Sequence, residues 1–187
     1  GLTKLTYVDL ESNGVTDISG LAGLTSISTL DLDNNDITDI SALAGLTSLK
    51  KLYLESNAIS TLSPLAGLTS LTELRLNGCG LANISALSGL TSLTTLNLSS
   101  NSITALAPLA GLTNLQVLQL YYNNFITDIS ELSALTNLRE LTLDKLEGWP
   151  KNDITDITAL ANMTNMQNLW LRNNGITDVS PLAGMTG

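Results

Sequence analysis

The chain has 187 residues, of which 43% are hydrophobic but only 4% aromatic, so its length allows one domain with an aliphatic core. Its 17 acidic and 8 basic residues give a net charge of −9, which excludes the clustered positive charge that nucleic acids and anionic membranes require. Histidine is absent, and Cys79 is the single cysteine, so no disulfide can form within the chain.

A 22-residue sequence repeats along the whole chain, and it begins at the first residue. Five uninterrupted copies occupy residues 1–22, 23–44, 45–66, 67–88 and 89–110. The sixth (111–133) has one additional residue, the seventh (134–161) has six, and the eighth (162–183) returns to 22. The last four residues begin a ninth copy. We expect one domain of eight repeats over residues 1–187.

Each copy contains L-x-x-L-x-L-x-x-N followed by x-I-T-D-I-S-x-L-A, which is the leucine-rich repeat pattern. The alternating L-x-L predicts a strand with one buried face, and strands at the same place in every repeat stack in parallel about 4.8 Å apart. The following stretch is too short for an α-helix and predicts 3₁₀ or irregular structure, with the Ser or Thr before Pro-Leu and the Asp of each "TD" pair as capping residues. The predicted fold is an α/β repeat, a right-handed curved horseshoe with a parallel β-sheet on the concave face and these segments on the convex face.

An asparagine follows each strand where the chain turns towards the convex side. Its amide can donate and accept hydrogen bonds together, so stacked repeats would form a ladder that satisfies buried backbone groups. The predicted rungs are Asn13, Asn35, Asn57, Cys79, Asn101, Asn123, Asn152 and Asn174. Cys79 is interpreted as a small buried thiol, since no activating base or cation lies near it in the sequence.

The seventh repeat departs from the pattern at "DKLEGWPK". Leu146 stands where the ladder asparagine belongs, so we expect Asn152 to take that rung. Gly148 and Pro150 are typical of a looped-out turn, which would leave the stack intact. Trp149 would then lie on the rim, where it either extends a binding surface or covers its own loop.

Polar positions around the two leucines of each strand are expected to face the concave side in three columns without a packing role. The first column is Tyr7, Thr29, Lys51, Glu73, Thr95, Val117, Glu140 and Asn168. The second is Asp9, Asp31, Tyr53, Arg75, Asn97, Gln119, Thr142 and Trp170. The third is Glu11, Asp33, Glu55, Asn77, Ser99, Tyr121, Asp144 and Arg172.

Two ends of this face carry candidate binding residues. Asp9, Glu11, Asp31 and Asp33 would gather at the N-terminal end, either as a solvated patch, a surface for a basic partner, or a weak calcium site, and no metal is assigned. Tyr121, Tyr122, Trp170 and Arg172 would gather at the C-terminal end, and these are residue types that dominate binding energy at interfaces. Arg172 has an alternative role as the ion-pair partner of Asp144.

Two further contacts are expected in the middle of the face. Tyr53 and Arg75 would stack, as a cation over an aromatic ring, and both are candidate partner-binding residues. Lys51 and Glu73 would form an ion pair, since they are neighbours in the first column.

The sequence "GLTSLTTLNLSSNSITALAPLA" and the recurring "NxITDISPLAxLTxL" resemble the 22-residue repeats of internalins and related bacterial surface proteins over essentially the whole chain. The resemblance implies a protein-binding domain of an exported protein, extracellular or at the bacterial cell surface, whose concave face meets the partner. The family's helical N-terminal cap and immunoglobulin-like C-terminal flank are missing here, and both terminal repeats are bare. We therefore expect a fragment of a longer chain that lacks both caps.

The predicted function is a protein–protein interaction module of adhesion or receptor type, on a secreted or surface-anchored bacterial protein. We expect a protein partner and no nucleic acid, no membrane insertion by this segment and no cofactor. One alternative is an intracellular regulator resembling the leucine-rich regulatory subunit of a Ser/Thr phosphatase, and another is a passive spacer. Enzyme activity is not expected, because a Ser-His-Asp or Cys-His arrangement needs histidine.

Overall fold

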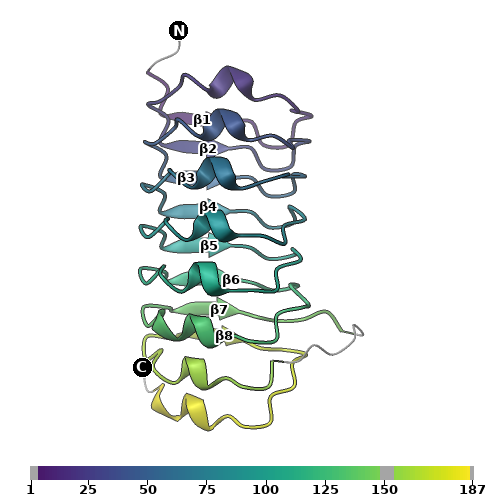
Figure 1. Ribbon diagram of the computed structural model, residues 1–187, viewed down its shortest axis with the longest axis vertical. Helices are drawn as coiled ribbons and strands as arrows, with labels where there is room; N and C mark the ends of the chain where they lie inside the picture. Colours follow the sequence, from purple (N-terminus) through teal and green to yellow (C-terminus); the bar gives the residue numbers. More distant parts are fainter. Residues whose placement is uncertain (1–3, 148–153, 186–187) are drawn as a thin grey trace.

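The computed structural model describes residues 4–147 and 154–185, and within them short strands and 3₁₀ turns alternate strictly (Figure 1). The strands are β1 (Tyr7–Asp9), β2 (Thr29–Asp31), β3 (Lys51–Tyr53), β4 (Glu73–Arg75), β5 (Thr95–Asn97), β6 (Val117–Gln119), β7 (Glu140–Thr142) and β8 (Asn168–Trp170). The 3₁₀ turns are η1 (Ser19–Leu21), η2 (Ser41–Leu43), η3 (Ser63–Leu65), η4 (Ser85–Leu87), η5 (Ala107–Leu109), η6 (Ser130–Ala134), η7 (Thr158–Leu160) and η8 (Ser180–Gly184).

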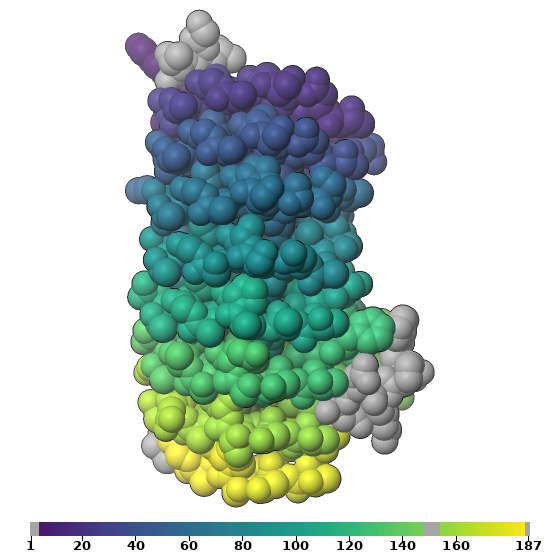
Figure 2. Space-filling model, in the orientation of Figure 1, coloured from purple at the N-terminus to yellow at the C-terminus, as the bar shows by residue number. Residues whose placement is uncertain are grey.

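The strands form one parallel sheet in the order β1 to β8, so each strand pairs only with the strands of the adjacent repeats. Figure 1 looks onto the 3₁₀ turns with the strands behind them, and Figure 2 shows the repeats as successive layers in sequence order. The register pairs each position with its equivalent one repeat away, as in Asp9 with Asp31 and Thr142 with Trp170. The predicted leucine-rich repeat solenoid is confirmed.

A continuous aliphatic core lies between the sheet and the 3₁₀ turns. The central leucine of each internal strand is fully buried, which applies to Leu30, Leu52, Leu74, Leu96, Leu118 and Leu141. Each such burial contributes about 1.5–3 kcal/mol. Val8 in β1 and Leu169 in β8 are only partly buried, because each terminal strand has a neighbouring repeat on one side only.

A side chain two residues before the 3₁₀ turn holds the turn in every repeat except that of η5, where Ala105 stands at this position. Oδ1 of Asp17 accepts the Ser19 N–H at 2.8 Å, and the same bond recurs at Asp39, Asp128, Asp156 and Asp178. The Ser19 backbone and hydroxyl lower the pKa of Asp17. The predicted capping role of these aspartates is confirmed.

The other capping prediction, for the Ser or Thr before Pro-Leu, is wrong. Ser63 is the first residue of η3, and its own N–H is the capped group, since it donates to the Thr61 hydroxyl at 3.2 Å.

No helix among residues 4–147 and 154–185 is long and apolar enough to cross a membrane.

Candidate protein-binding face

The candidate surface is the sheet face, which comprises the outward side chains of β1 to β8 and the second residue after each strand. Its first two columns have the predicted register throughout. The third column is less open than predicted, because Asp33, Asn77 and Ser99 are buried, with exposed fractions of 6%, 8% and 0%. Thr142 of the second column is buried as well, at 9%. The expectation that all three columns lack a packing role is therefore wrong for these four residues. Alternation ends with the strand, and the chain then turns inwards.

The second column also has a structural role. Oδ1 of Asp9 accepts the Glu11 N–H, and Oδ1 of Asp31 accepts the Asp33 N–H, each at 3.0 Å. These bonds close the turn that follows the strand, as short polar side chains commonly do. The acidic character of this end of the face thus has a local structural cause in addition to any role in binding.

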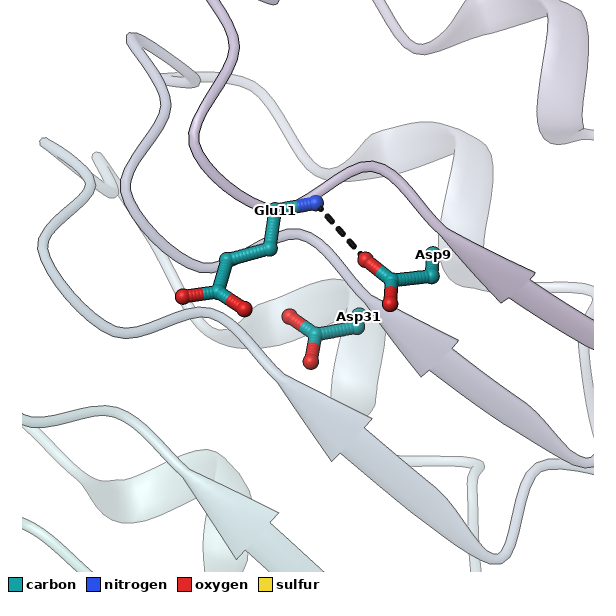
Figure 3. Close-up of side chains that lie close together, drawn as sticks. All are labelled: Asp9, Glu11 and Asp31. Atoms are coloured by element: carbon teal, nitrogen blue, oxygen red, sulfur yellow. Dashed lines mark hydrogen bonds between the residues drawn. The ribbon is translucent and has the colours of Figure 1, made fainter.

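Three carboxylates converge at the N-terminal end of the sheet face (Figure 3). One oxygen from each of Asp9, Glu11 and Asp31 lies within 4.8 Å of the others. Asp33, the fourth predicted member, does not join them, because it is buried and its Oδ1 accepts the Glu55 N–H from the next repeat. The exposed cluster presents concentrated negative charge, which suits a basic side chain of a partner.

Burial gives Asp33 unusual acid–base behaviour. Loss of hydration raises the pKa of its carboxyl to about 6, against the opposing effect of the Glu55 N–H. Asp31 and Glu55 raise this pKa further, and Arg75 lowers it. A carboxylate in this position destabilises the fold near neutral pH.

The middle of the sheet face carries a compact charged and aromatic group. The Arg75 guanidinium lies 4.4 Å from the centre of the Tyr53 ring, which confirms the predicted stacking. Glu73 pairs with Lys51 at 3.1 Å, as predicted, and also with Arg75 at 3.0 Å. Because Arg75 is exposed and held in place from two sides, its guanidinium is presented to a partner with little remaining freedom.

The C-terminal end of the sheet face contains a pocket of about 260 Å³. Its lining is Tyr121, Tyr122, Thr142, Asp144, Trp170 and Arg172. The structure therefore brings together the four residues predicted there and adds Thr142 and Asp144. The rings of Tyr121 and Tyr122 meet edge to face, with centroids 5.2 Å apart, an arrangement that aromatic pairs favour.

Arg172 forms the ion pair with Asp144 that was the alternative prediction for it. Its Nη2 and Nε each lie 3.1 Å from Asp144 Oδ2, and its backbone N–H donates to Oδ1 at 2.7 Å. The two side chains differ in exposure, at 76% for Arg172 and 15% for Asp144. The pair is neutral overall, yet the solvent meets the guanidinium rather than the carboxylate.

Tyr122 has a backbone conformation that is unfavourable for its residue type. It lies in the left-handed region at φ 60°, at the position just before the ladder asparagine. The equivalent positive-φ residues in other repeats are Ser12, Asn34, Ser56, Gly78, Ser100 and Asn173. Left-handed backbone costs an L-residue about 1–2 kcal/mol, and glycine and asparagine tolerate it best. A bulky ring here is the exception in the series.

The asparagine ladder has the predicted form. Nδ2 of Asn57 donates to the Leu32 carbonyl of the preceding repeat and to two carbonyls of its own turn, while its Oδ1 accepts the Ile37 N–H. Asn35 and Asn101 bond in the same way, and Asn123 does so with one carbonyl of its own turn instead of two. Asn13 and Asn174, in the terminal repeats, make part of the set.

Cys79 replaces only the donor half of a rung. Its thiol donates to the Leu54 carbonyl at 3.1 Å. The acceptor half is missing: the Ile37 N–H donates to Asn57, but the equivalent Ile59 N–H has no acceptor among the hydrogen bonds of the described residues. Burial raises the pKa of the thiol to about 11. The thiolate is therefore scarce at neutral pH, as expected for an unreactive thiol.

Two predicted residues, Trp149 and Asn152, lie outside the described residues. At the edge of that segment Leu146 is exposed, and its N–H donates to Asn124 Oδ1 at 3.3 Å. Phe125, beside the single-residue insertion of the sixth repeat, is also exposed. Leu146 and Phe125 thus follow pocket-lining residues, Asp144 and Tyr122, within three positions of the sequence.

A second asparagine ladder was not found from the sequence. Nδ2 of Asn114, Asn137 and Asn165 donates to the Thr91, Thr113 and Thr136 carbonyls of the preceding repeats at 2.9–3.1 Å. The signal was available, since asparagine follows the threonine in "LTNL", "LTNL" and "MTNM" of these three repeats, where the earlier repeats have serine or lysine. The three amides and Arg139 help line a polar groove of about 360 Å³ at the start of the strands.

Comparisons with known proteins agree with this geometry. The family model described as leucine-rich repeats (two copies) matches in overlapping segments, at residues 3–45, 25–67, 47–89, 69–111, 91–134, 113–151 and 136–184. A search of curated proteins found no match.

Three of the similar solved structures come from bacteria. Internalin C2 of Listeria monocytogenes is 37% identical, with a TM-score of 0.90 over 97% of this chain and 77% of that one. Internalin F of the same organism is 37% identical, with a TM-score of 0.77 over 98% of this chain and 59% of that one. A leucine-rich repeat protein of Leptospira interrogans is 25% identical, with a TM-score of 0.78 over 98% of this chain and 54% of that one. The chain belongs to the leucine-rich repeat family and, within it, to the internalin-like bacterial proteins.

Proposed function

We propose that this chain is the partner-binding module of a secreted or surface-anchored bacterial protein, and that its sheet face contacts the partner. The coarser assignment, a module for protein–protein interaction, rests on the leucine-rich repeat family and the internalin relatives. The partner is a protein, and the role is adhesion or receptor recognition rather than catalysis.

The observation that carries the proposal is the contrast between the repeated core and the varied sheet face. Every internal strand buries a leucine at its centre, whereas the outward positions beside it change from acidic to basic to aromatic along the stack. The central core position is constrained by the neighbouring repeats, but the exposed outward positions are not. Exposed Arg75 stacked on Tyr53, and the pocket at Trp170, are features that packing of the solenoid does not need.

The extracellular location is supported by similarity rather than by geometry. Internalins C2 and F are 37% identical over nearly the whole chain, and this subgroup is associated with the bacterial surface. This chain spans 77% and 59% of those two structures, so the activity of the complete protein forms part of the proposal.

A capture experiment tests the role of the sheet face. The immobilised domain is exposed to extracellular host proteins, and bound proteins are identified by mass spectrometry. Arg75→Glu combined with Tyr53→Ala should abolish capture of a specific partner. The control is Ala82→Glu with Thr104→Glu, which lowers the net charge by the same two units at exposed positions before η4 and η5. Equal capture by both variants would contradict the proposal.

A further inference from the structure

We infer that the C-terminal pocket is the anchor site of the sheet face, that it takes a bulky apolar side chain next to a carboxylate on a protein partner, and that Tyr122 is its key wall. The inference rests on the proposed function for its biological meaning. Its three grounds are the size and lining of the pocket, the exposure of Arg172, and the backbone conformation of Tyr122.

The size and lining of the pocket define the first half of the ligand. A volume of about 260 Å³ is below the range of about 300–1,000 Å³ for sites that hold whole small molecules, and it suits one inserted side chain. Tyr121, Tyr122 and Trp170 supply aromatic walls. A bulky apolar group replaces water against these walls, which is how anchor residues generate binding energy at interfaces.

The exposed charge defines the second half of the ligand. Both oxygens of Asp144 are already bonded to Arg172, and the carboxylate is the hidden member of the pair. Arg172 uses Nε and Nη2 for that pair, while its side chain as a whole is 76% exposed. A guanidinium forms charge-assisted hydrogen bonds with a carboxylate, and these are about twice as strong as bonds between neutral groups. The pocket entrance therefore favours a carboxylate and disfavours a cation.

The unfavourable backbone conformation of Tyr122 is the third ground, because it indicates that this residue is kept for binding. The same position elsewhere holds Ser, Asn or Gly at positive φ, and of these residues glycine and asparagine adopt the turn with the least strain. Strained residues persist where the surrounding structure holds them and cluster at binding sites. Tyr122 is 40% exposed as a residue, so its ring is not retained to fill the core. It lines the pocket instead.

Small probes test the pocket without needing the natural partner. N-acetyl-phenylalanine carries a ring and a carboxylate, N-acetyl-phenylalaninamide lacks the charge, and N-acetyl-lysine amide carries a cation. Binding is followed by NMR at the indole N–H of Trp170, assigned with a Trp149→Phe variant. We expect saturable binding of N-acetyl-phenylalanine at millimolar concentrations, several-fold weaker binding of its amide, and none of the lysine probe.

The variants separate a binding role from a structural one. Tyr122→Asn should weaken N-acetyl-phenylalanine binding at least about tenfold, as truncation of an anchor ring does. It should melt no lower than Tyr122→Phe, because asparagine tolerates this backbone better. Tyr122→Phe should keep the binding, and Arg172→Gln should remove the preference for the carboxylate. Tyr7→Asn, the same change at an exposed tyrosine outside the pocket, should leave the binding unchanged.

Four results would overturn the inference. These are absence of N-acetyl-phenylalanine binding, unchanged probe binding in Tyr122→Asn, a melting temperature of Tyr122→Asn well below that of Tyr122→Phe, and tighter binding of the lysine probe than of N-acetyl-phenylalanine. Because the probes bind this chain directly, failure of the capture experiment would not affect the result. Conversely, absence of probe binding would leave partner capture by the middle of the sheet face intact.

Discussion

Replacement of Asp33 by asparagine should stabilise the protein at neutral pH. The pKa of Asp33 is raised from 3.8 to about 6 mainly by burial, so the folded state binds the proton more tightly than the unfolded state. The protonated Asp33 carboxyl therefore makes its full contribution to the free energy of unfolding below about pH 4, and this contribution is lost as the pH rises through 6. A shift of about two units corresponds to about 3 kcal/mol.

Asparagine removes the charge but keeps an oxygen that can accept the Glu55 N–H. An asparagine already stands at the equivalent buried position, Asn77, although its Oδ1 does not accept a bond like the one at Asp33. We therefore expect Asp33→Asn to raise the free energy of unfolding by about 2–3 kcal/mol at pH 7. The advantage should shrink towards zero near pH 4, where the native carboxyl is protonated.

Urea denaturation followed by circular dichroism between pH 4 and pH 7.5 measures this difference. Asp36→Asn is the matched control, because it makes the same charge change three residues away at an exposed side chain. A variant Asp33→Asn that is less stable than the parent at pH 7, or whose advantage is the same at pH 4 and pH 7, would refute the reasoning.

Three other outcomes follow from the ladder. Asn101→Ala should lower the free energy of unfolding by about 3–5 kcal/mol, since it removes the hydrogen-bond partner of five backbone groups. In the same urea titration, Asn13→Ala at the exposed end should lower it by less than about 1 kcal/mol. Cys79→Asn should raise the melting temperature by restoring an acceptor for the Ile59 N–H, worth about 1 kcal/mol, and a lower melting temperature would count against the ladder account. A thiol reagent at pH 7 should label Cys79 only after unfolding, because its pKa is about 11 and it is buried.

The fold and the strand register were predictable because both depend on local repetition. One L-x-L per repeat fixes where each strand begins, and equal spacing fixes which residues become neighbours. The pairs Arg75 with Tyr53 and Arg172 with Asp144 followed from that register alone, and the structure contains both. In stacked repeats the sequence spacing determines which residues are neighbours, whereas in an irregular fold it does not.

Burial within the third column was not predictable in the same way. The alternation of the strand assigns Asp33 and Ser99 to the outer face, yet both are buried where the chain turns inwards after the strand. Their environment depends on the turn of the neighbouring repeat, and the two-residue period of a strand does not describe it. The left-handed conformation of Tyr122 belongs to the same turn, although its sequence signal was present in the Ser, Asn and Gly of other repeats.

Residues that depart from the repeat pattern differ in whether they expose a new chemical group to solvent. This difference separates tolerated substitutions from functional ones. Cys79 departs from the ladder inside the protein, where it loses an acceptor and exposes no new chemistry. Tyr122 departs from its series at the surface, where it adds strain together with an exposed aromatic ring beside Trp170 and Arg172. A residue that lowers stability without an exposed group is most simply a tolerated substitution. A residue that lowers stability and also builds a pocket is retained for what the pocket binds, which places the anchor of this module at its C-terminal end.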